Sequence, residues 1–139
     1  MSITSLAHVC LRGPDLDSVT RFYCGVLGLK KQFNFVKQGK IIGLYLKIAD
    51  NNFIEVFQAD NPHESDRGSR LSHFCLETDC IETLRKSFVD AGYDPGEIKM
   101  GADQSYQFWI EDPTGVFIEF HQYTPDSSQT TGKDVEVNW

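Results

Sequence analysis

The sequence predicts an α+β fold made of two copies of one module, in the order strand, helix, strand, strand, strand. Three observations carry this prediction: two strand-like segments recur, a helix-like segment recurs between them, and a polar segment separates the copies. With 139 residues, the chain suits one compact domain or two small modules that share a core. Its hydrophobic share of 40% and aromatic share of 12% argue against extensive disorder.

The strand-like segments recur almost in register. Residues 6–11 (LAHVCL) reappear as residues 71–76 (LSHFCL), and residues 53–58 (FIEVFQ) reappear as residues 117–122 (FIEFHQ). The offset is 65 residues for the first pair of segments and 64 for the second. Such a duplication predicts that any site built on these segments is assembled from equivalent positions of the two halves.

A helix-like pattern follows the first strand of each half. Apolar residues stand at i, i+3 and i+7, as Leu16, Val19 and Tyr23 in one half and Ile81, Leu84 and Phe88 in the other. Asp15, after Pro14, is typical of a helix start. In the second half, Asp79 with Glu82 three residues later predicts a capping box.

The remaining strands complete the module in each half. We predict them at residues 31–36 and 41–48 in the first half, and at residues 93–99 and 105–110 in the second. Gln38-Gly39 separates the first pair, Gly92 ends the second helix, and residues 112–115 (DPTG) have the pattern of a type I turn.

These patterns divide the chain into four segments. They are a first module (1–58), a linker (59–70), a second module (71–124) and a C-terminal tail (125–139). The linker is polar and contains Pro62 and Gly68. The tail is rich in Ser, Thr and Asp and has little periodicity, which predicts a loose tail or a docking arm.

Charge and composition exclude several classes of partner. The formal charge of -7, without a basic cluster, disfavours nucleic acid and anionic membranes. Residues 1–5 do not resemble a secretion signal, and no run of about 18 apolar residues predicts a membrane span, so we expect a cytoplasmic protein. The four cysteines form no Cys-x-x-Cys pair, and we expect them to be reduced.

The four recurring strands carry His8, Glu55, His73 and Glu119 among apolar neighbours. A carboxylate buried there without a partner is destabilising by several kcal/mol or more, so each Glu must be exposed, paired with a cation or protonated. Taken singly, each residue fits a core histidine or a solvent-facing glutamate. If the modules pack about a pseudo-twofold axis, however, the four side chains converge, and their donors suit one divalent ion of Zn, Ni, Co, Mn or Fe.

Three further residues share strand faces with these four, because alternate strand residues point the same way. We expect Cys10 and Cys75 to pack as small core hydrophobes, since cysteine is among the most often buried residue types. His121 lies on the same strand face as Glu119, where it could orient a metal ligand or contact substrate. A position in which it only supports the metal ligands, or one at the protein surface, is an equal alternative.

These blocks, with residues 22–29 (FYCGVLGL) and 111–119 (EDPTGVFIE), resemble the vicinal oxygen chelate superfamily of glyoxalases, bleomycin-resistance proteins and extradiol dioxygenases. The resemblance covers residues 3–123 and implies two βαβββ modules whose curled mixed sheets enclose a metal site, often in a homodimer. The order His, Glu, His, Glu resembles the bacterial glyoxalase I type, which maps the metal ligands onto His8, Glu55, His73 and Glu119.

That branch implies a lyase or isomerase that transfers a proton next to a carbonyl through a metal-bound enediolate. The resemblance nominates Glu119 as the base and Glu55 as a ligand, and the near-symmetry leaves the opposite assignment open. Arg12 matches a family position that helps to hold the glutathione carboxylate, whereas Ala59 stands where glyoxalase I has Asn. We therefore expect a small-molecule substrate such as a thiol conjugate, which need not be the methylglyoxal hemithioacetal of glutathione.

Two other function classes stay open. Extradiol dioxygenases and fosfomycin-type thiol transferases use the same scaffold with three ligands, so Glu55 favours the four-ligand branch. A non-catalytic drug-binding protein of the superfamily typically lacks the ligands that are present here.

Overall fold

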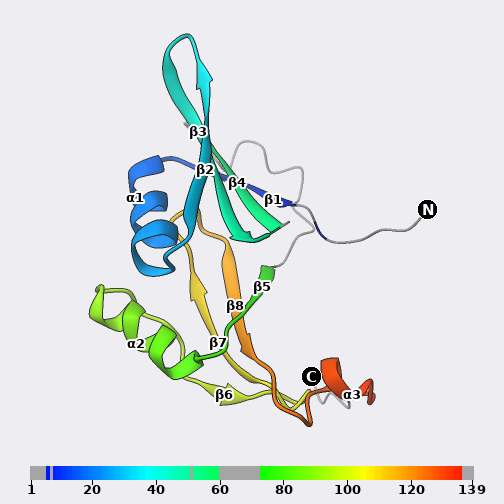
Figure 1. Cartoon of the computed structure of the whole chain (residues 1–139). Helices are drawn as coiled ribbons and strands as arrows, with labels where there is room; N and C mark the ends of the chain where they lie inside the picture. Colours follow the sequence, from blue (N-terminus) through cyan, green and yellow to red (C-terminus); the bar gives the residue numbers. More distant parts are fainter. Residues whose placement is uncertain (1–5, 7, 51, 60–72, 136–139) are drawn as a thin grey trace, which may run out of the picture. The chain divides into compact units, whose positions relative to one another are not determined.

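The computed structural model describes residues 6, 8–50, 52–59 and 73–135, and confirms the α+β class. The order strand, helix, three strands occurs twice, in two sheets of four strands each (Figure 1). By their contacts the residues form two units: Met1–Ser69 with Asp112–Gly115, and Arg70–Glu111 with Val116–Trp139. Each unit is described by itself below. The predicted linker lies outside the described residues, apart from Ala59.

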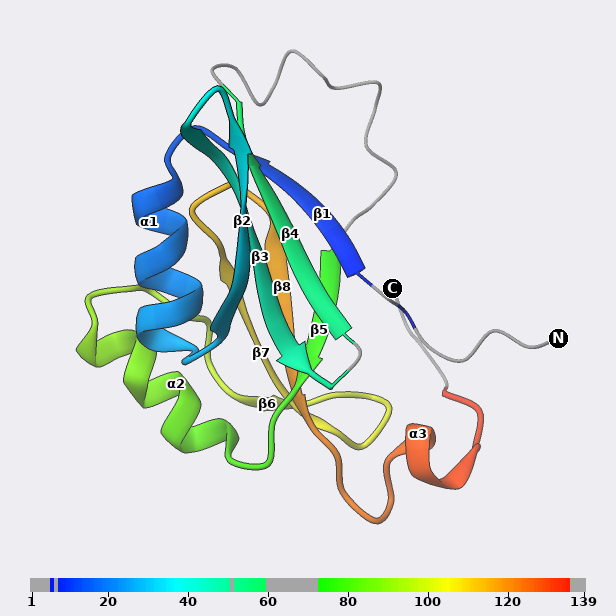
Figure 2. The same cartoon turned by 45° about the horizontal axis from the view of Figure 1, so that its top comes forward.

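The first unit contains one mixed sheet and one helical segment. Its elements are β1 (His8–Gly13), α1 (Leu16–Thr20), η1 (Arg21–Val26), β2 (Lys30–Lys37), β3 (Lys40–Ala49) and β4 (Asn52–Gln58). The strand order is β1-β4-β3-β2, with β1 parallel to β4 and the other pairs antiparallel (Figure 2). The two strands that carry His8 and Glu55 are therefore direct neighbours.

The second unit repeats this arrangement. Its elements are β5 (His73–Glu77), α2 (Ile81–Asp90), β6 (Lys99–Met100), β7 (Tyr106–Glu111), β8 (Phe117–Gln122) and α3 (Ser128–Thr131). The strand order is β5-β8-β7-β6, with β5 parallel to β8. The strands of His73 and Glu119 are again neighbours, as the duplication predicts.

The two helix starts differ. The Asp15 carboxylate accepts hydrogen bonds from the backbone N–H groups of Asp17 and Ser18 and caps α1, as predicted. The helix then widens into the π-helix η1, which the sequence pattern did not predict. The predicted capping box of Asp79 and Glu82 is wrong: the N-cap of α2 is Cys80, whose side chain makes no capping bond.

Instead, the side chain of Gln122 in β8 supplies a partner at the start of α2. Its Oε1 accepts a hydrogen bond of 2.8 Å from the backbone N–H of Ile81. An acceptor from 41 residues away therefore satisfies one of the free donors at the helix start. At the other end, Gly92 at φ 85° closes the helix, as predicted, and Tyr93 N–H donates to the Phe88 carbonyl at 3.0 Å.

The strand predictions hold except in one place. Gln38 and Gly39 both have positive φ, which matches the two-residue hairpin between β2 and β3. The DPTG turn is confirmed by the 3.0 Å bond from Gly115 N–H to the Asp112 carbonyl. The strand predicted at residues 93–99 is instead the two-residue β6 (Lys99–Met100), because most of that segment lacks ladder partners.

The C-terminal tail is not loose where the structure describes it. Residues 128–131 form α3, and the buried Ser127 hydroxyl lies 2.9 Å from that of Ser105. Gln129 Nε2 donates to Asp103 Oδ2 at 2.6 Å. These contacts attach the tail to the loop before β7. Residues 136–139 of the tail lie outside the described residues.

Each unit buries one face of its sheet with its helix. In the first unit the buried side chains include Val19, Phe22 and Tyr23 of the helical segment and Leu11, Leu44, Leu46, Ile54 and Val56 of the sheet. In the second they include Ile81 and Phe88 of α2 and Phe108, Ile110, Ile118 and Phe120 of the sheet. Successive side chains of a strand point to opposite faces of the sheet. The side chains of His8, Glu55, His73 and Glu119 therefore lie on the faces opposite the two cores.

We expect Tyr23→Phe to lower the free energy of unfolding by about 1–3 kcal/mol, because it removes a buried hydrogen-bond donor. The Tyr23 hydroxyl donates to Asp112 Oδ2 at 2.7 Å, and its burial, together with the negative charge of Asp112, raises the pKa of Tyr23. Urea denaturation measures the change. The matched control is Tyr106→Phe, where the tyrosine is 42% exposed, and an equal loss in both variants would contradict this reading.

Candidate metal centre

The first unit places His8 beside Glu55. His8 Nε2 lies 3.4 Å from Glu55 Oε2, and the side chains are 43% and 17% exposed. The Tyr45 hydroxyl lies 3.5 Å from the other ring nitrogen, His8 Nδ1. The pair therefore stands on strands β1 and β4 with one imidazole nitrogen directed at the carboxylate.

Aromatic rings cover the same face of this sheet around Glu55. They belong to Phe33, Phe35, Tyr45, Phe53 and Phe57, and neighbouring rings lie with centroids 4.5 to 6.1 Å apart. Tyr45 and Cys10 flank Glu55 in the strand register. An apolar surround of this kind lowers the local dielectric constant and strengthens any charge interaction that Glu55 makes.

The second unit repeats the pair. His73 Nε2 lies 3.5 Å from Glu119 Oε2, and the side chains are 36% and 11% exposed. The rings of Trp109 and His73 pack in an edge-to-face arrangement, with centroids 4.6 Å apart. The two copies thus present the same donors, an imidazole nitrogen and a carboxylate oxygen, at almost the same separation.

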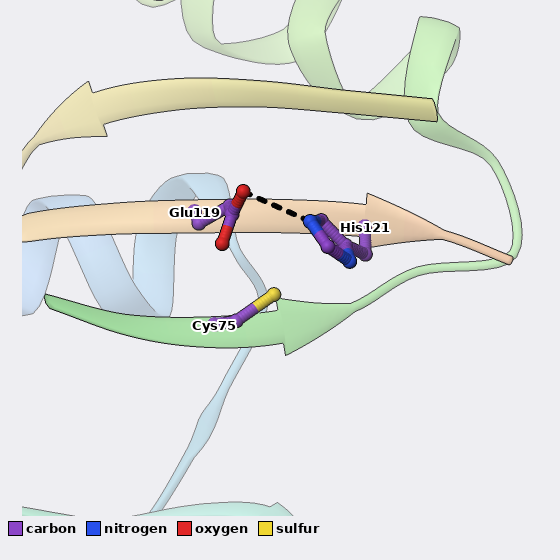
Figure 3. Close-up of side chains that lie close together, drawn as sticks. All are labelled: Cys75, Glu119 and His121. Carbon is purple, nitrogen blue, oxygen red and sulfur yellow. Dashed lines mark ion pairs between the residues drawn. The ribbon is translucent and has the colours of Figure 1, made fainter. Parts of the chain in front are cut away.

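The second unit adds a cluster that has no counterpart among the described residues of the first unit. His121 Nε2 lies 2.9 Å from Glu119 Oε1, and Cys75 of the neighbouring strand β5 directs its sulfur toward this ion pair (Figure 3). Gln107 Oε1 is 3.2 Å from His121 Nε2, and Asp103 Oδ2 is 3.8 Å from His121 Nδ1. Glu119 therefore has its two oxygens engaged differently, Oε2 by His73 and Oε1 by His121.

Each predicted site residue lies on the face of its sheet that is opposite the hydrophobic core of its unit. Arg12 is exposed on β1, two positions along from Cys10 and opposite Phe57. His121 is 8% exposed and contacts Glu119, so the alternative of a position at the protein surface is excluded. The structure brings each His together with the Glu of its own unit. That the two pairs share one ion stays a prediction.

The predicted core positions of Cys10 and Cys75 are wrong, because both residues are exposed. Their strand neighbours Leu11, Ile118 and Phe120 fill the cores, and the period of two directs the cysteines to the faces of the glutamates. The average tendency of cysteine to be buried therefore gives way to the strand pattern.

Both thiols are held in the protonated form. Burial of the thiol, followed by the charge of Glu119, raises the pKa of Cys75 to about 12, although the residue as a whole is exposed. Burial and the charge of Glu55 likewise raise the pKa of Cys10. Because the thiolate is the nucleophile, both cysteines are poor ones near neutral pH.

We expect Cys75 in the metal-free protein to react with iodoacetamide at pH 8 at least about 100-fold more slowly than in the unfolded chain. Mass spectrometry of peptides from time points measures this rate for each cysteine separately. Glu119→Gln removes the largest charge effect that raises the pKa of Cys75, so it should accelerate the reaction. A rate equal to that of the unfolded chain would contradict the assignment.

Sequence reasoning missed two neighbours of the site. Asp103 lies in the loop before β7, and Gln107 is the register partner of His121 on β7. Neither stands in a motif. Only the strand pairing could have placed Gln107 beside His121, and the sequence contains no signal for the loop that brings Asp103 there.

The fold and this pair of His-Glu sites define a class. The model of the Glyoxalase/Bleomycin resistance protein/Dioxygenase superfamily matches residues 5–120, and the chain belongs to this superfamily. A protein of Synechocystis sp. described as a probable lactoylglutathione lyase is 29% identical over 125 residues, covering 84% of this chain and 94% of that protein.

Solved structures support the fold. A glyoxalase family protein from Enterococcus faecalis matches with a TM-score of 0.72 at 20% identity, covering 87% of this chain and 99% of that one. The lactoylglutathione lyase from Agrobacterium tumefaciens matches with a TM-score of 0.66 at 19% identity, covering 88% and 96%. Among the described residues, no helix is both long enough and apolar enough to span a membrane.

Proposed function

We propose that the protein is a divalent-metal-dependent lyase or isomerase of the glyoxalase type, with His8, Glu55, His73 and Glu119 as the metal ligands. The observation that supports this most is the duplicated pair: a histidine nitrogen lies 3.4 Å from a glutamate oxygen in one unit and 3.5 Å in the other. Superfamily membership and the lactoylglutathione lyase relative support the same class.

The donor set fits a divalent cation. Two imidazole nitrogens and two carboxylate oxygens suit Zn, Ni, Co, Mn or Fe, and two negative charges match the charge of the ion. The low exposure of Glu55 and Glu119, at 17% and 11% of their side chains, makes a cationic partner favourable. Such an ion would act as a Lewis acid that polarises a substrate carbonyl.

A glutamate of the site would carry out the proton transfer. A glutamate beside the substrate accepts the proton next to the carbonyl and returns it to the neighbouring carbon. We assign this role to Glu119 and keep Glu55 as a ligand. His121 contacts Glu119 Oε1 at 2.9 Å, and the longer contact, 3.5 Å from His73 Nε2, is to Oε2. We assign the substrate proton to Oε2, which is the less closely held of the two oxygens.

The substrate in this proposal is a small molecule with two adjacent oxygens, such as a thiol conjugate. Arg12 is exposed on the strand face of His8 and offers a cation for a substrate carboxylate, and His121 offers a second polar contact. The proposal includes a homodimer in the cytoplasm. Analytical ultracentrifugation measures the oligomeric state.

Elemental analysis of protein purified without chelators, combined with hemithioacetal isomerisation assays across several divalent metals, tests the proposal. We expect one metal ion per chain and turnover that is lost on chelation and restored by the metal. Oxygen-dependent cleavage of catechols would instead assign a dioxygenase. Ligand-induced stabilisation without turnover or bound metal would assign a non-catalytic binding protein.

A further inference from the structure

We propose that the second unit by itself binds a thiophilic divalent cation, Zn²⁺ or Cd²⁺, through Cys75 Sγ, the Glu119 carboxylate and His121 Nε2. Each residue offers one donor atom, and the three atoms lie within 4.8 Å of one another. In Figure 3 the sulfur of Cys75 and the ring of His121 lie around the Glu119 carboxylate. This site needs neither His8 nor Glu55, so it does not depend on the proposed enzymatic function.

The backbone already holds the three donors on one face of the sheet. Cys75 and Glu119 are register partners on the parallel strands β5 and β8. Glu119 and His121 are two residues apart on β8 and therefore point the same way. Binding would order little additional chain, because the donors belong to a paired part of the sheet.

The carboxylate of Asp103, beside the second ring nitrogen of His121, also supports metal binding at this site. Asp103 Oδ2 lies 3.8 Å from His121 Nδ1, the ring nitrogen that does not face Glu119. Asp103 is itself held, by Gln129 Nε2 at 2.6 Å and by the backbone N–H of Ser105 at 3.2 Å. Metal-binding histidines very often direct their second nitrogen at a carboxylate, which orients the ring.

The donor types favour a soft or borderline metal. Sulfur, imidazole nitrogen and carboxylate oxygen with one water complete a four-coordinate shell of the kind that Zn²⁺ prefers. When the cation binds, the Cys75 thiol loses its proton to solvent and the sulfur binds as thiolate. The thiolate and the Glu119 carboxylate then offset the two positive charges.

The first unit offers an internal comparison. Phe57 stands at the position equivalent to His121, so the pair of Cys10 and Glu55 has no imidazole there. The second site also shares Glu119 with the proposed four-ligand set, so the two sets compete for that carboxylate. We therefore expect excess zinc to inhibit the proposed activity and Cys75→Ser to relieve the inhibition.

Titration of the full-length, metal-stripped protein with Cd²⁺ tests the site through ultraviolet sulfur-to-metal charge-transfer absorption. We expect a band that saturates at one equivalent, disappears in Cys75→Ser and persists in the matched control Cys10→Ser. His121→Phe copies the first unit, and it should weaken Cd²⁺ binding about tenfold or more, as should Asp103→Asn. Circular dichroism confirms that each variant is folded.

Two outcomes overturn the proposal: no charge-transfer band in the unmodified protein, or a band that survives in Cys75→Ser. The variants His8→Ala and Glu55→Gln separate this proposal from the enzymatic one. We expect them to keep the Cd²⁺ band while losing metal-dependent turnover. Loss of the band in both variants would contradict a site confined to the second unit, whereas unchanged turnover would contradict only the four-ligand set.

Discussion

Glu119→Gln is expected to lower kcat of the metal-loaded protein about a thousandfold, because it removes both the proposed base and one anionic ligand. Glutamine keeps the shape of the side chain, so the β8 strand should remain paired and circular dichroism should be unchanged. The amide cannot accept a proton from the substrate, and it binds a divalent cation less strongly than a carboxylate does. Steady-state kinetics at saturating metal measures the loss.

The control for this variant is Glu111→Gln, which changes an exposed glutamate of the same sheet. Its kcat should stay within about twofold of the unmodified protein, as expected for a surface substitution. If Glu119→Gln kept both its metal and its kcat, neither the ligand role nor the base role of Glu119 would stand.

Phe88→Ala is expected to lower the free energy of unfolding by about 3–5 kcal/mol, the range for a fully buried aromatic side chain. Phe88 is 0% exposed, and its ring centroid lies 5.7 Å from that of Phe120 and 6.1 Å from that of Phe108. Its removal leaves a cavity between α2 and the sheet that carries Glu119. A small domain is stable by only about 5–15 kcal/mol, so much of the stability would be lost.

Urea denaturation followed by circular dichroism measures this loss. Val89→Ala is the matched control, because Val89 is the next residue of the helix and is 48% exposed. That substitution should change the free energy of unfolding by less than about 0.5 kcal/mol. A loss below about 1 kcal/mol for Phe88→Ala would mean that α2 does not anchor the sheet in the way described.

The features predictable from the sequence are those set by local periodicity. The recurrence of LAHVCL and FIEVFQ defined β1, β4, β5 and β8 and placed each ionisable residue opposite its core. Asp15 signalled the start of α1 because its capping bonds reach only two and three residues ahead. Such signals need no knowledge of the tertiary structure.

The features that escaped prediction depend on contacts between distant segments. Gln122 partners the start of α2 from another strand, so Asp79 and Glu82 gave a misleading local signal. The approach of Asp103 to His121 depends on the loop that carries Asp103. The hydrogen bond that Gln129 donates to Asp103 depends on the path of the C-terminal tail. The cysteines are exposed because the alternation of side chains along the strand places them opposite the core, and this overrides the average tendency of cysteine to be buried.

Anomalous diffraction from crystals of the Mn²⁺-loaded protein locates the metal among the proposed ligands, because Mn²⁺ prefers nitrogen and oxygen donors over thiolates. We expect one anomalous peak per site, bound directly by the imidazoles of His8 and His73 and the carboxylates of Glu55 and Glu119, whether these come from one chain or two. A peak bound by other residues, or the four side chains lying apart in every subunit pairing of the crystal, would contradict it.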